Sequence, residues 1–254
     1  MTTPYIIAIA GASCSGKTTI AAELAHSLHD DPTTIIGLDS YYYDLSHLGP
    51  EEIHTHNLDE PAALDHTLLL ENVAALARGD AIEKPVYGHK NHRRRAEPEH
   101  IEPTPFLIIE GLFALYWEAL RRYTQTKVFI DASHDLCLQR RITRDRNQRG
   151  RTVEEVTRRY RTMVGPMFDR HVLPTRKYAD TIIEGADPID RSTAAILEHI
   201  TAGGGGGRSG RGDTGGGDSG NAGGGRSGRG SAGGGDSGRT GDEAPHDKRR
   251  GHPE

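Results

Sequence analysis

The sequence has little of what marks a secreted, membrane or disulfide-rich protein. It contains only two cysteines, Cys14 and Cys137, in 254 residues, which is too few for a disulfide framework and gives no metal-binding spacing. No apolar run approaches the length of a membrane-spanning helix, and the N-terminus lacks the basic stretch of a signal peptide. These absences predict a cytoplasmic protein with no membrane partner.

An excess of basic residues is also missing. The formal net charge is −5, from 31 Lys+Arg and 36 Asp+Glu. A dedicated duplex-DNA binder needs surplus cations to displace counterions. The charge balance therefore argues against a nucleic-acid partner, although it leaves room for a locally basic site.

Large apolar side chains disappear near the C-terminal end. Residues 201–254 hold 22 of the 32 glycines, and their only apolar residues are alanines. Such a segment cannot bury a core, so we expect a disordered Gly/Arg/Ser/Asp-rich tail over 201–254. Residues 1–200 are long enough and apolar enough for one globular domain.

Short apolar runs rich in β-branched residues recur along that domain. They lie at 5–10, 34–38, 106–111, 127–131 and 180–184. Helical patterns separate them; Ile20, Leu24 and Leu28, for example, repeat every four residues. This alternation predicts an α/β fold, with a parallel five-stranded sheet covered by helices on both faces.

The polar stretch at 40–104 interrupts the alternation of strands and helices. It contains one clear helical pattern, which Pro61 is suited to begin and Gly79 to end. Ligands of parallel sheets gather at the carboxyl edge. We therefore expect 40–104 to be a small substrate-binding insertion over that edge. Further along, Thr152 and Glu155 have the spacing of a capping box that opens another helix.

The strongest motif is GASCSGKT at 11–18, which matches G-x-x-x-x-G-K-[ST] in full and stands between a predicted strand and a predicted helix. In such a loop the backbone N–H groups and the helix N-terminus bind phosphate oxygens. Lys17 is expected to bridge the β- and γ-phosphates, and the hydroxyl of Thr18 to bind Mg²⁺. A glycine-rich turn that binds nothing is the alternative, which the flanking strand and helix disfavour. The expected nucleotide-binding residues are Gly11, Ala12, Ser13, Cys14, Ser15, Gly16, Lys17, Thr18 and Thr19.

Acidic side chains follow two of the predicted strands. Asp39 comes after the run at 34–38, and Glu110 lies in the run at 106–111. Because parallel strands end at one edge of the sheet, both carboxylates are expected beside the phosphate loop. A carboxylate there can bind Mg²⁺ or accept a proton from an attacking hydroxyl. Capping of a strand end is the alternative, but two coincident acids favour catalysis.

Arginine is concentrated in one segment, QRRITRDRNQRGR at 139–151. Arg141 and Arg144 are three apart and share a helical face, whereas Leu138 and Ile142 form a separate apolar stripe. The spacing is compatible with a solvated amphipathic helix. It is equally compatible with a lid whose guanidinium groups close over the transferring phosphoryl group.

Seven segments, taken together and in order, resemble the uridine kinase (uridine–cytidine kinase) family of P-loop kinases. The resemblance covers residues 5–200 and leaves the tail outside. The segments are GASCSGKT (11–18), LDSYYYDL (38–45), NLDEP (57–61), PVYGHKNHR (85–93), IIEGLFAL (108–115), RRITRDRNQRGR (140–151) and LPTRKYAD (173–180). The resemblance implies a P-loop NTPase-type fold and transfer of a phosphoryl group from ATP or GTP to the ribose 5′-hydroxyl of uridine, and of cytidine, for pyrimidine salvage.

The resemblance also implies roles for the matching residues. Asp39 corresponds to the base toward the 5′-hydroxyl and lies near Mg²⁺, which Thr18 and Glu110 help to bind. Asp59 corresponds to the carboxylate that holds the ribose hydroxyls, as two hydrogen bonds from vicinal hydroxyls allow. Tyr87 and His92 correspond to residues that contact the pyrimidine.

The arginine segment matches family arginines as well. Phosphate or substrate contacts are implied for Arg141, Arg144, Arg149 and Arg151. The chain departs from the family at Arg159, where glutamine is usual and contacts the nucleoside. The preference between uridine and cytidine therefore stays open. Family members commonly form homotetramers, so a homo-oligomer is expected.

Three other functions are less compatible with the sequence. A phosphoribulokinase is the nearest alternative, and PVYGHKNHR with Asp59 favours a nucleoside over a sugar phosphate. The N-K-x-D signature of a regulatory GTPase is absent from this sequence. A nucleic-acid scaffold acting through the tail would lack aromatic residues there for base stacking.

Histidine pairs such as His54/His56 and His89/His92 lack the companion ligands of a metal site.

Overall fold

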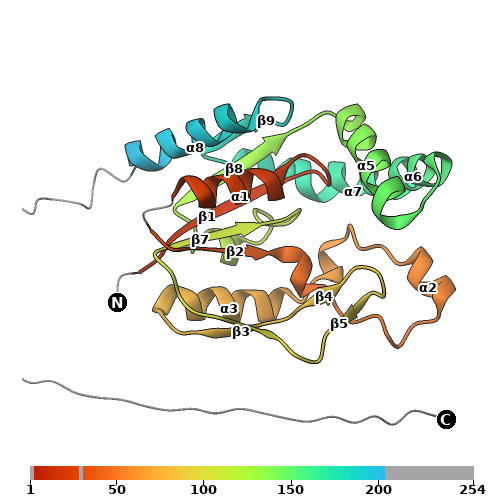
Figure 1. Cartoon of the computed structure of the whole chain (residues 1–254), viewed down its shortest axis with the longest axis horizontal. Helices are drawn as coiled ribbons and strands as arrows, with labels where there is room; N and C mark the ends of the chain where they lie inside the picture. Colours follow the sequence, from red (N-terminus) through yellow and green to blue (C-terminus); the bar gives the residue numbers. More distant parts are fainter. Residues whose placement is uncertain (1–2, 29–30, 204–254) are drawn as a thin grey trace, which may run out of the picture. The chain divides into compact units, whose positions relative to one another are not determined.

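The computed structural model describes residues 3–28 and 31–203. Its centre is a five-stranded sheet in the order β2-β7-β1-β8-β9 (Figure 1). The strands are β1 (Tyr5–Gly11), β2 (Thr33–Gly37), β7 (Phe106–Glu110), β8 (Thr126–Asp131) and β9 (Thr181–Glu184). All four pairings are parallel. The predicted α/β class and its five strands are confirmed.

Side chains of β1 alternate between two cores, because successive strand residues point to opposite faces. Ile7 and Ile9 belong to a cluster with Ile20 of α1 (Lys17–Ser27) and Ile196 of α8 (Ile189–Gly203). Figure 1 shows α1 and α8 side by side on this face. Because α8 runs to Gly203, it crosses the domain boundary expected at residue 200; the rest of the expected tail lies outside the described residues.

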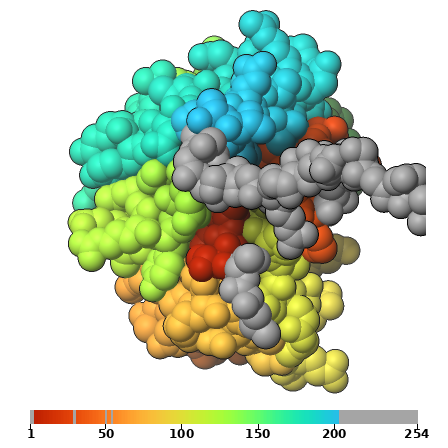
Figure 2. Space-filling model, turned by 90° about the vertical axis from the view of Figure 1, so that its left-hand side faces the viewer, coloured from red at the N-terminus to blue at the C-terminus, as the bar shows by residue number. Residues whose placement is uncertain are grey.

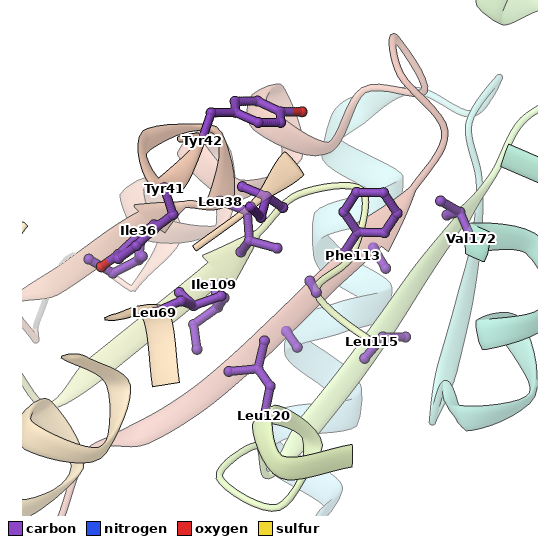
Figure 3. Close-up of a cluster of buried hydrophobic side chains, with 14 of the residues drawn as sticks. Ile36, Leu38, Tyr41, Tyr42, Leu69, Ile109, Phe113, Leu115, Leu120 and Val172 are labelled. Carbon is purple, nitrogen blue, oxygen red and sulfur yellow. The ribbon is translucent and has the colours of Figure 1, made fainter. Parts of the chain in front are cut away.

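The opposite face of the sheet carries the larger core. Ile6, Ala8 and Ala10 of β1 pack there with α3 (His66–Arg78) and α4 (Glu118–Arg121). Figure 3 shows Ile36, Ile109, Leu69 and Leu120 meeting between the sheet and these helices. Tyr41, Phe113 and Phe129 are among the largest fully buried side chains. A sheet buried on both faces explains why its strands are nearly continuous apolar runs.

After β8, a run of helices begins at the carboxyl end of the sheet. It comprises α5 (His134–Arg149), α6 (Val153–Arg159) and α7 (Gly165–Met167), with π-helical turns at Tyr160–Val164 and Phe168–Val172. A 3-10 segment, Leu173–Tyr178, leads to β9. The Thr152 capping box is present, because its hydroxyl accepts from the Glu155 N–H and the Glu155 carboxylate accepts from the Thr152 N–H.

The insertion has more regular structure than its sequence indicated. Besides α3 it contains α2 (Pro50–Thr55) and two antiparallel pairs. These are β3 (Ile82–Lys84) with β6 (Glu99–Ile101), and β4 (Tyr87–Gly88) with β5 (Arg93–Arg94). Figure 1 places α2 near α5 and α6 at the same end of the sheet.

The expected start of the insertion's helix is wrong by five residues. Pro61 begins a 3-10 turn, Pro61–Ala63, whereas α3 begins at His66. The physical reason is Asp65, whose carboxylate caps the helix by accepting from the Leu68 N–H at 3.2 Å. Gly79 ends α3 as expected, with φ of 89°.

An aromatic stack joins the insertion to the sheet. The rings of His66, at the start of α3, and Trp117, just before α4, lie nearly parallel with centroids 5.6 Å apart. The face in Figure 2 shows the orange and yellow insertion below and the cyan and blue C-terminal part of the described chain above. No helix in the described ranges is both long and apolar enough to cross a membrane.

Candidate active site

A cavity of about 150 Å³ lies at the carboxyl edge of the sheet. It brings together nine residues for which catalytic, metal-binding or substrate-binding roles were expected, and they come from six separate segments. They are Lys17, Thr18, Asp39, Asp59, His92, Glu110, Arg141, Arg144 and Arg149. Ser13 and Cys14 of the phosphate loop also line it.

Some predicted residues lie beside this cavity. Tyr87 is buried behind His92, and its hydroxyl lies 3.3 Å from Nδ1 of His92. Arg151 and Arg159 line a neighbouring cavity of about 310 Å³, which shares Arg141 with the first. A guanidinium N–H of Arg159 donates to the backbone carbonyl of His56 at 3.1 Å. The other residues predicted to bind the nucleotide do not line the first cavity. They are Gly11, Ala12, Ser15, Gly16 and Thr19.

The phosphate loop connects β1 to α1 in a strained conformation. Gly16 is the N-cap of α1 with φ of 113°, a region that L side chains rarely adopt. Cys14 has φ of 66° although it is not glycine. The Lys17 ammonium folds back over the loop and donates to the carbonyl of Ala12 at 2.7 Å. Strain of this kind is typical of sites where backbone N–H groups converge on a ligand.

Thr18 and Glu110 lie in direct contact at the predicted metal site. The Thr18 hydroxyl donates to Oε1 of Glu110 at 3.1 Å. Burial raises the pKa of Glu110. The neighbouring Lys17 lowers this pKa, but its effect is smaller than that of burial. Gly37 is paired with Glu110 across β2 and β7, and a Cβ there would lie 3.5 Å from the carboxylate.

Asp39 completes the set of oxygen donors around the cavity. It lies in the 3-10 turn Leu38–Tyr41 that follows β2, and 60% of its side chain is exposed. One hydroxyl and two carboxylates fit Mg²⁺, which prefers oxygen ligands and keeps several waters and phosphate oxygens. In the described ranges no group of three or more His, Cys, Asp or Glu side chains could hold a metal by itself. The oxygen donors of Thr18, Asp39 and Glu110 fit a magnesium ion.

Asp59, from the insertion, lines the same cavity as the phosphate loop. Burial raises its pKa, while Arg141 and then Arg159 oppose the rise. Its backbone N–H donates to the side-chain oxygen of Asn57 at 3.0 Å, which fixes the turn that presents it. A partly buried carboxylate of this kind is suited to accept hydrogen bonds from neutral hydroxyls.

Four rings form an aromatic wall beside Asp59, which we define as Tyr42, Tyr87, His89 and His92. The Tyr42 and Tyr87 centroids are 5.4 Å apart, and Tyr87 meets His89 edge-on at 5.3 Å. His92 has φ of 54°, and burial, followed by His89, lowers its pKa. His92 is thus suited to act as a neutral ring that both donates and accepts hydrogen bonds.

The arginine segment surrounds a buried carboxylate, Asp145. Arg144 Nη2 lies 2.9 Å and Arg151 Nη1 3.2 Å from its oxygens, and the Nε atoms of Arg141 and Arg149 lie at 3.8 Å. Burial raises the pKa of Asp145, but the arginines, led by Arg144, outweigh it and hold the pKa below its usual value. Only 1% of the Asp145 side chain is exposed.

This arrangement decides against a solvated amphipathic helix at 139–151. The Arg141 side chain is 7% exposed, and its Nη1 donates to the Ser13 hydroxyl of the phosphate loop at 2.9 Å. The side chains of Arg141, Arg144 and Arg149 line the cavity, which is compatible with the predicted lid. Sequence reasoning missed Asp145, Tyr42 and His89. Asp145 was hidden in a run of charges, although its i,i+4 spacing from Arg141 and Arg149 was a usable signal.

Comparisons with known proteins identify the family of the chain. The model of the "Phosphoribulokinase / Uridine kinase family" matches residues 6–190. The chain is 43% identical over 183 residues to a uridine kinase of Brevibacillus brevis, covering 72% of this chain and 86% of that protein. It is 44% identical over 182 residues to a uridine kinase of Salmonella typhimurium, covering 70% and 85%.

Solved structures show the same fold at low identity. A fructose transport system kinase described as putative, from Silicibacter, matches with a TM-score of 0.61 and 19% identity, over 72% of this chain and 90% of that one. The phosphoribulokinase of Rhodobacter spheroides matches with a TM-score of 0.53 and 15% identity, over 74% of each chain.

Proposed function

Because the chain belongs to the phosphoribulokinase/uridine kinase family, we propose that it transfers the terminal phosphoryl group of ATP or GTP to the 5′-hydroxyl of uridine and cytidine, giving UMP and CMP. The two relatives described above are uridine kinases at 43% and 44% identity. The observation that carries the proposal is that the phosphate loop, Asp39 and Asp59 line one cavity. Pyrimidine salvage in the cytoplasm is the role that this reaction serves.

The donor end of the site is built from charge and backbone dipoles. Lys17 and the loop N–H groups bind the β- and γ-phosphates at the N-terminus of α1. Thr18, Glu110 and Asp39 would hold Mg²⁺, which would supply charge to neutralise the phosphate oxygens. Arg144 and Arg149 face the same cavity and stabilise the charge that develops on the transferred group.

The acceptor end holds the nucleoside so that its 5′-hydroxyl faces the donor. Asp59 accepts hydrogen bonds from the 2′- and 3′-hydroxyls, and the aromatic wall contacts the pyrimidine. Asp39, exposed to the cavity and 3.8 Å from His89 Nε2, accepts the proton from the 5′-hydroxyl as the phosphoryl group arrives. Arg141, Arg151 and Arg159 enclose the substrate from the lid side.

A sugar-phosphate kinase is the second candidate, and one observation favours it. Arg151, Arg158 and Arg159 line the cavity beside Arg141, where a second phosphate group would find cationic partners. The aromatic wall has no role in recognising a sugar phosphate, so the nucleoside remains the better fit.

An acceptor panel tests the proposal. Uridine, cytidine, 2′-deoxyuridine, adenosine and ribulose 5-phosphate are each assayed with Mg·ATP and with Mg·GTP. We expect kcat/KM to be highest for uridine or cytidine and lowest for ribulose 5-phosphate. Preferential use of the sugar phosphate would instead establish the second candidate. Sedimentation of the same preparation tests the expected homo-oligomer, a tetramer in many members of the family.

A further inference from the structure

The guanidinium group of Arg140, on α5, joins two loops from opposite ends of the chain. Its Nη1 donates to the carbonyl of Ser15 at 2.9 Å and approaches that of Cys14 at 3.5 Å, both in the phosphate loop. Its Nη2 donates to the carbonyl of Gly185, between β9 and α8, at 2.9 Å. Across the described residues no carboxylate pairs with Arg140. The guanidinium group therefore donates its hydrogen bonds to backbone carbonyls.

Holding the Ser15 carbonyl also sets the direction of the next N–H group. In a trans peptide, the C=O of one residue and the N–H of the following residue point in opposite directions. The N–H of Gly16 is therefore directed away from Arg140. Gly16 is the N-cap of α1, and N–H groups at this position of a phosphate loop bind phosphate oxygens. The orientation of one phosphate-binding group thus depends on Arg140.

Gly185 packs closely against the phosphate loop. A Cβ at Gly185 would lie 2.7 Å from the Cβ of Ala132 and 3.1 Å from the carbonyl oxygen of Ser15. The Gly185 N–H donates to the carbonyl of Asp131 at 2.6 Å, which ties the loop to β8. The Gly185 and Ser15 carbonyls are thereby close enough for one planar guanidinium to bind both.

We propose that Arg140 is a positioning residue for the phosphates of the donor nucleotide. It fixes the Ser15–Gly16 peptide from outside the loop, and it fastens that peptide to the helix that carries Arg141 and Arg144. The phosphate loop and the lid arginines are therefore held as one unit before the nucleotide binds. This inference rests on the proposed function, because it requires a nucleoside triphosphate as donor.

Binding measurements separate this role from contact with the nucleoside part of the donor. Calorimetry gives the Kd of ATP, inorganic tripolyphosphate and uridine for the wild type, Arg140→Ala, Arg140→Lys and Arg146→Ala. Arg146 is the matched control, an exposed arginine on the same helix. We expect Arg140→Ala to weaken ATP and tripolyphosphate by the same factor, about 10- to 100-fold, and to leave uridine binding unchanged. Arg140→Lys should recover only part of the lost affinity, since an ammonium group lacks the planar array of donors with which a guanidinium binds two carbonyls.

Two outcomes would overturn the proposal. Unchanged tripolyphosphate binding with weaker ATP binding would mean that Arg140 contacts the nucleoside part of the donor. Unchanged affinity for both would mean that the loop holds its shape without Arg140. Should Arg140→Ala not fold, Gly185→Ala is the second variant, and it must weaken tripolyphosphate binding while uridine binding persists. A wild type that binds tripolyphosphate but phosphorylates no nucleoside would contradict the proposed function and leave this inference standing.

Discussion

The three carboxylates of the site lie in different surroundings, and each suits a different task. Asp39 is exposed to the cavity, where a proton acceptor must meet its substrate. Glu110 is held against Thr18 and Lys17, where a cation would offset its buried charge. Asp59 is partly buried opposite Arg141 and Arg159, where it can bind neutral hydroxyls. These differences lead to three predictions.

Asp39→Asn should lower kcat by ~10²- to 10⁴-fold, because the amide keeps the shape of the side chain and loses the proton acceptor. Binding of ATP without Mg²⁺ should change little, since the phosphate loop is untouched. Steady-state kinetics and calorimetry of the same preparation check both parts. Turnover close to that of the wild type would remove Asp39 from the mechanism.

2′-Deoxyuridine should be a poorer substrate than uridine by about 5- to 150-fold in kcat/KM, because one hydrogen bond to Asp59 is left unmade. Asp59→Asn should shrink this discrimination, since the amide accepts with one oxygen instead of two. Equal kcat/KM for both nucleosides in the wild type would assign Asp59 to another task.

Glu110→Gln should stabilise the protein at neutral pH while impairing catalysis. Burial raises the pKa of Glu110, so the folded chain binds this proton more tightly than the unfolded chain does and loses stability as pH rises through the folded pKa. We expect a higher Tm for the variant at pH 7, by about 2 to 4 °C for each kcal/mol. The gain should vanish below about pH 4, where glutamate is protonated in both states.

Glu97→Gln is the control for this comparison, because Glu97 is exposed. Its Tm should follow that of the wild type at every pH. A Glu110→Gln variant that melts lower than the wild type at pH 7 would show that the buried charge is compensated within the protein.

Among the elements, α5 shows most clearly how a charge run becomes a binding surface. Its arginines would repel one another around the cavity without the carboxylate of Asp145 between them. Removing one member of a buried ion-pair cluster typically costs about 3 to 5 kcal/mol. We therefore expect Asp145→Asn to lower the free energy of unfolding in urea by this amount. Added tripolyphosphate should restore part of it by neutralising the arginines.

Asp135→Asn, at an exposed position in the first turn of the same helix, is the control for Asp145. It should lower the free energy of unfolding by less than about 1 kcal/mol, the usual value of a charge at a helix N-terminus. Equal losses for both variants would show that Asp145 does no more than an exposed helix charge.

The elements also differ in how far the sequence predicts them. The five sheet strands were predictable because burial on both faces demands long apolar runs, as in YIIAIAG of β1. The pairs β3/β6 and β4/β5 were not, because strands of two or three residues have no periodicity to detect. The start of α3 at His66 depends on one cap by Asp65, which competes with a proline four residues earlier.

Site residues, like the helices and strands, were predictable only where a local sequence pattern places them. Those at strand ends or in the phosphate loop, such as Glu110 and Lys17, were predictable because the sheet places them. His89 and Tyr42 were not, because their meeting depends on the fold of the insertion, which no local pattern fixes.

At the scale of the whole molecule, α8 should be essential for stability, whereas the segment after it should contribute nothing to stability. Ile196 and Ile200 of α8 are buried against β1 and α1, whereas residues 204–254 have no apolar side chain larger than alanine. A chain ending at Gly203 should match the full chain in Tm and kcat/KM, since that segment has nothing to offset the entropy of ordering it. A chain ending at residue 188 should not fold, because its loss uncovers one face of the sheet. A drop in Tm for the chain ending at Gly203 would show that the C-terminal segment docks.

Trp117 is the single tryptophan of the chain, and its ring lies on that of His66. Since His66 begins α3 and Trp117 precedes α4, all of the indole fluorescence arises where the insertion meets the sheet. Any movement of the insertion on substrate binding separates or tightens this ring pair. The emission of the unlabelled enzyme is therefore an intrinsic reporter of that movement, and stopped-flow fluorescence can time it against phosphoryl transfer.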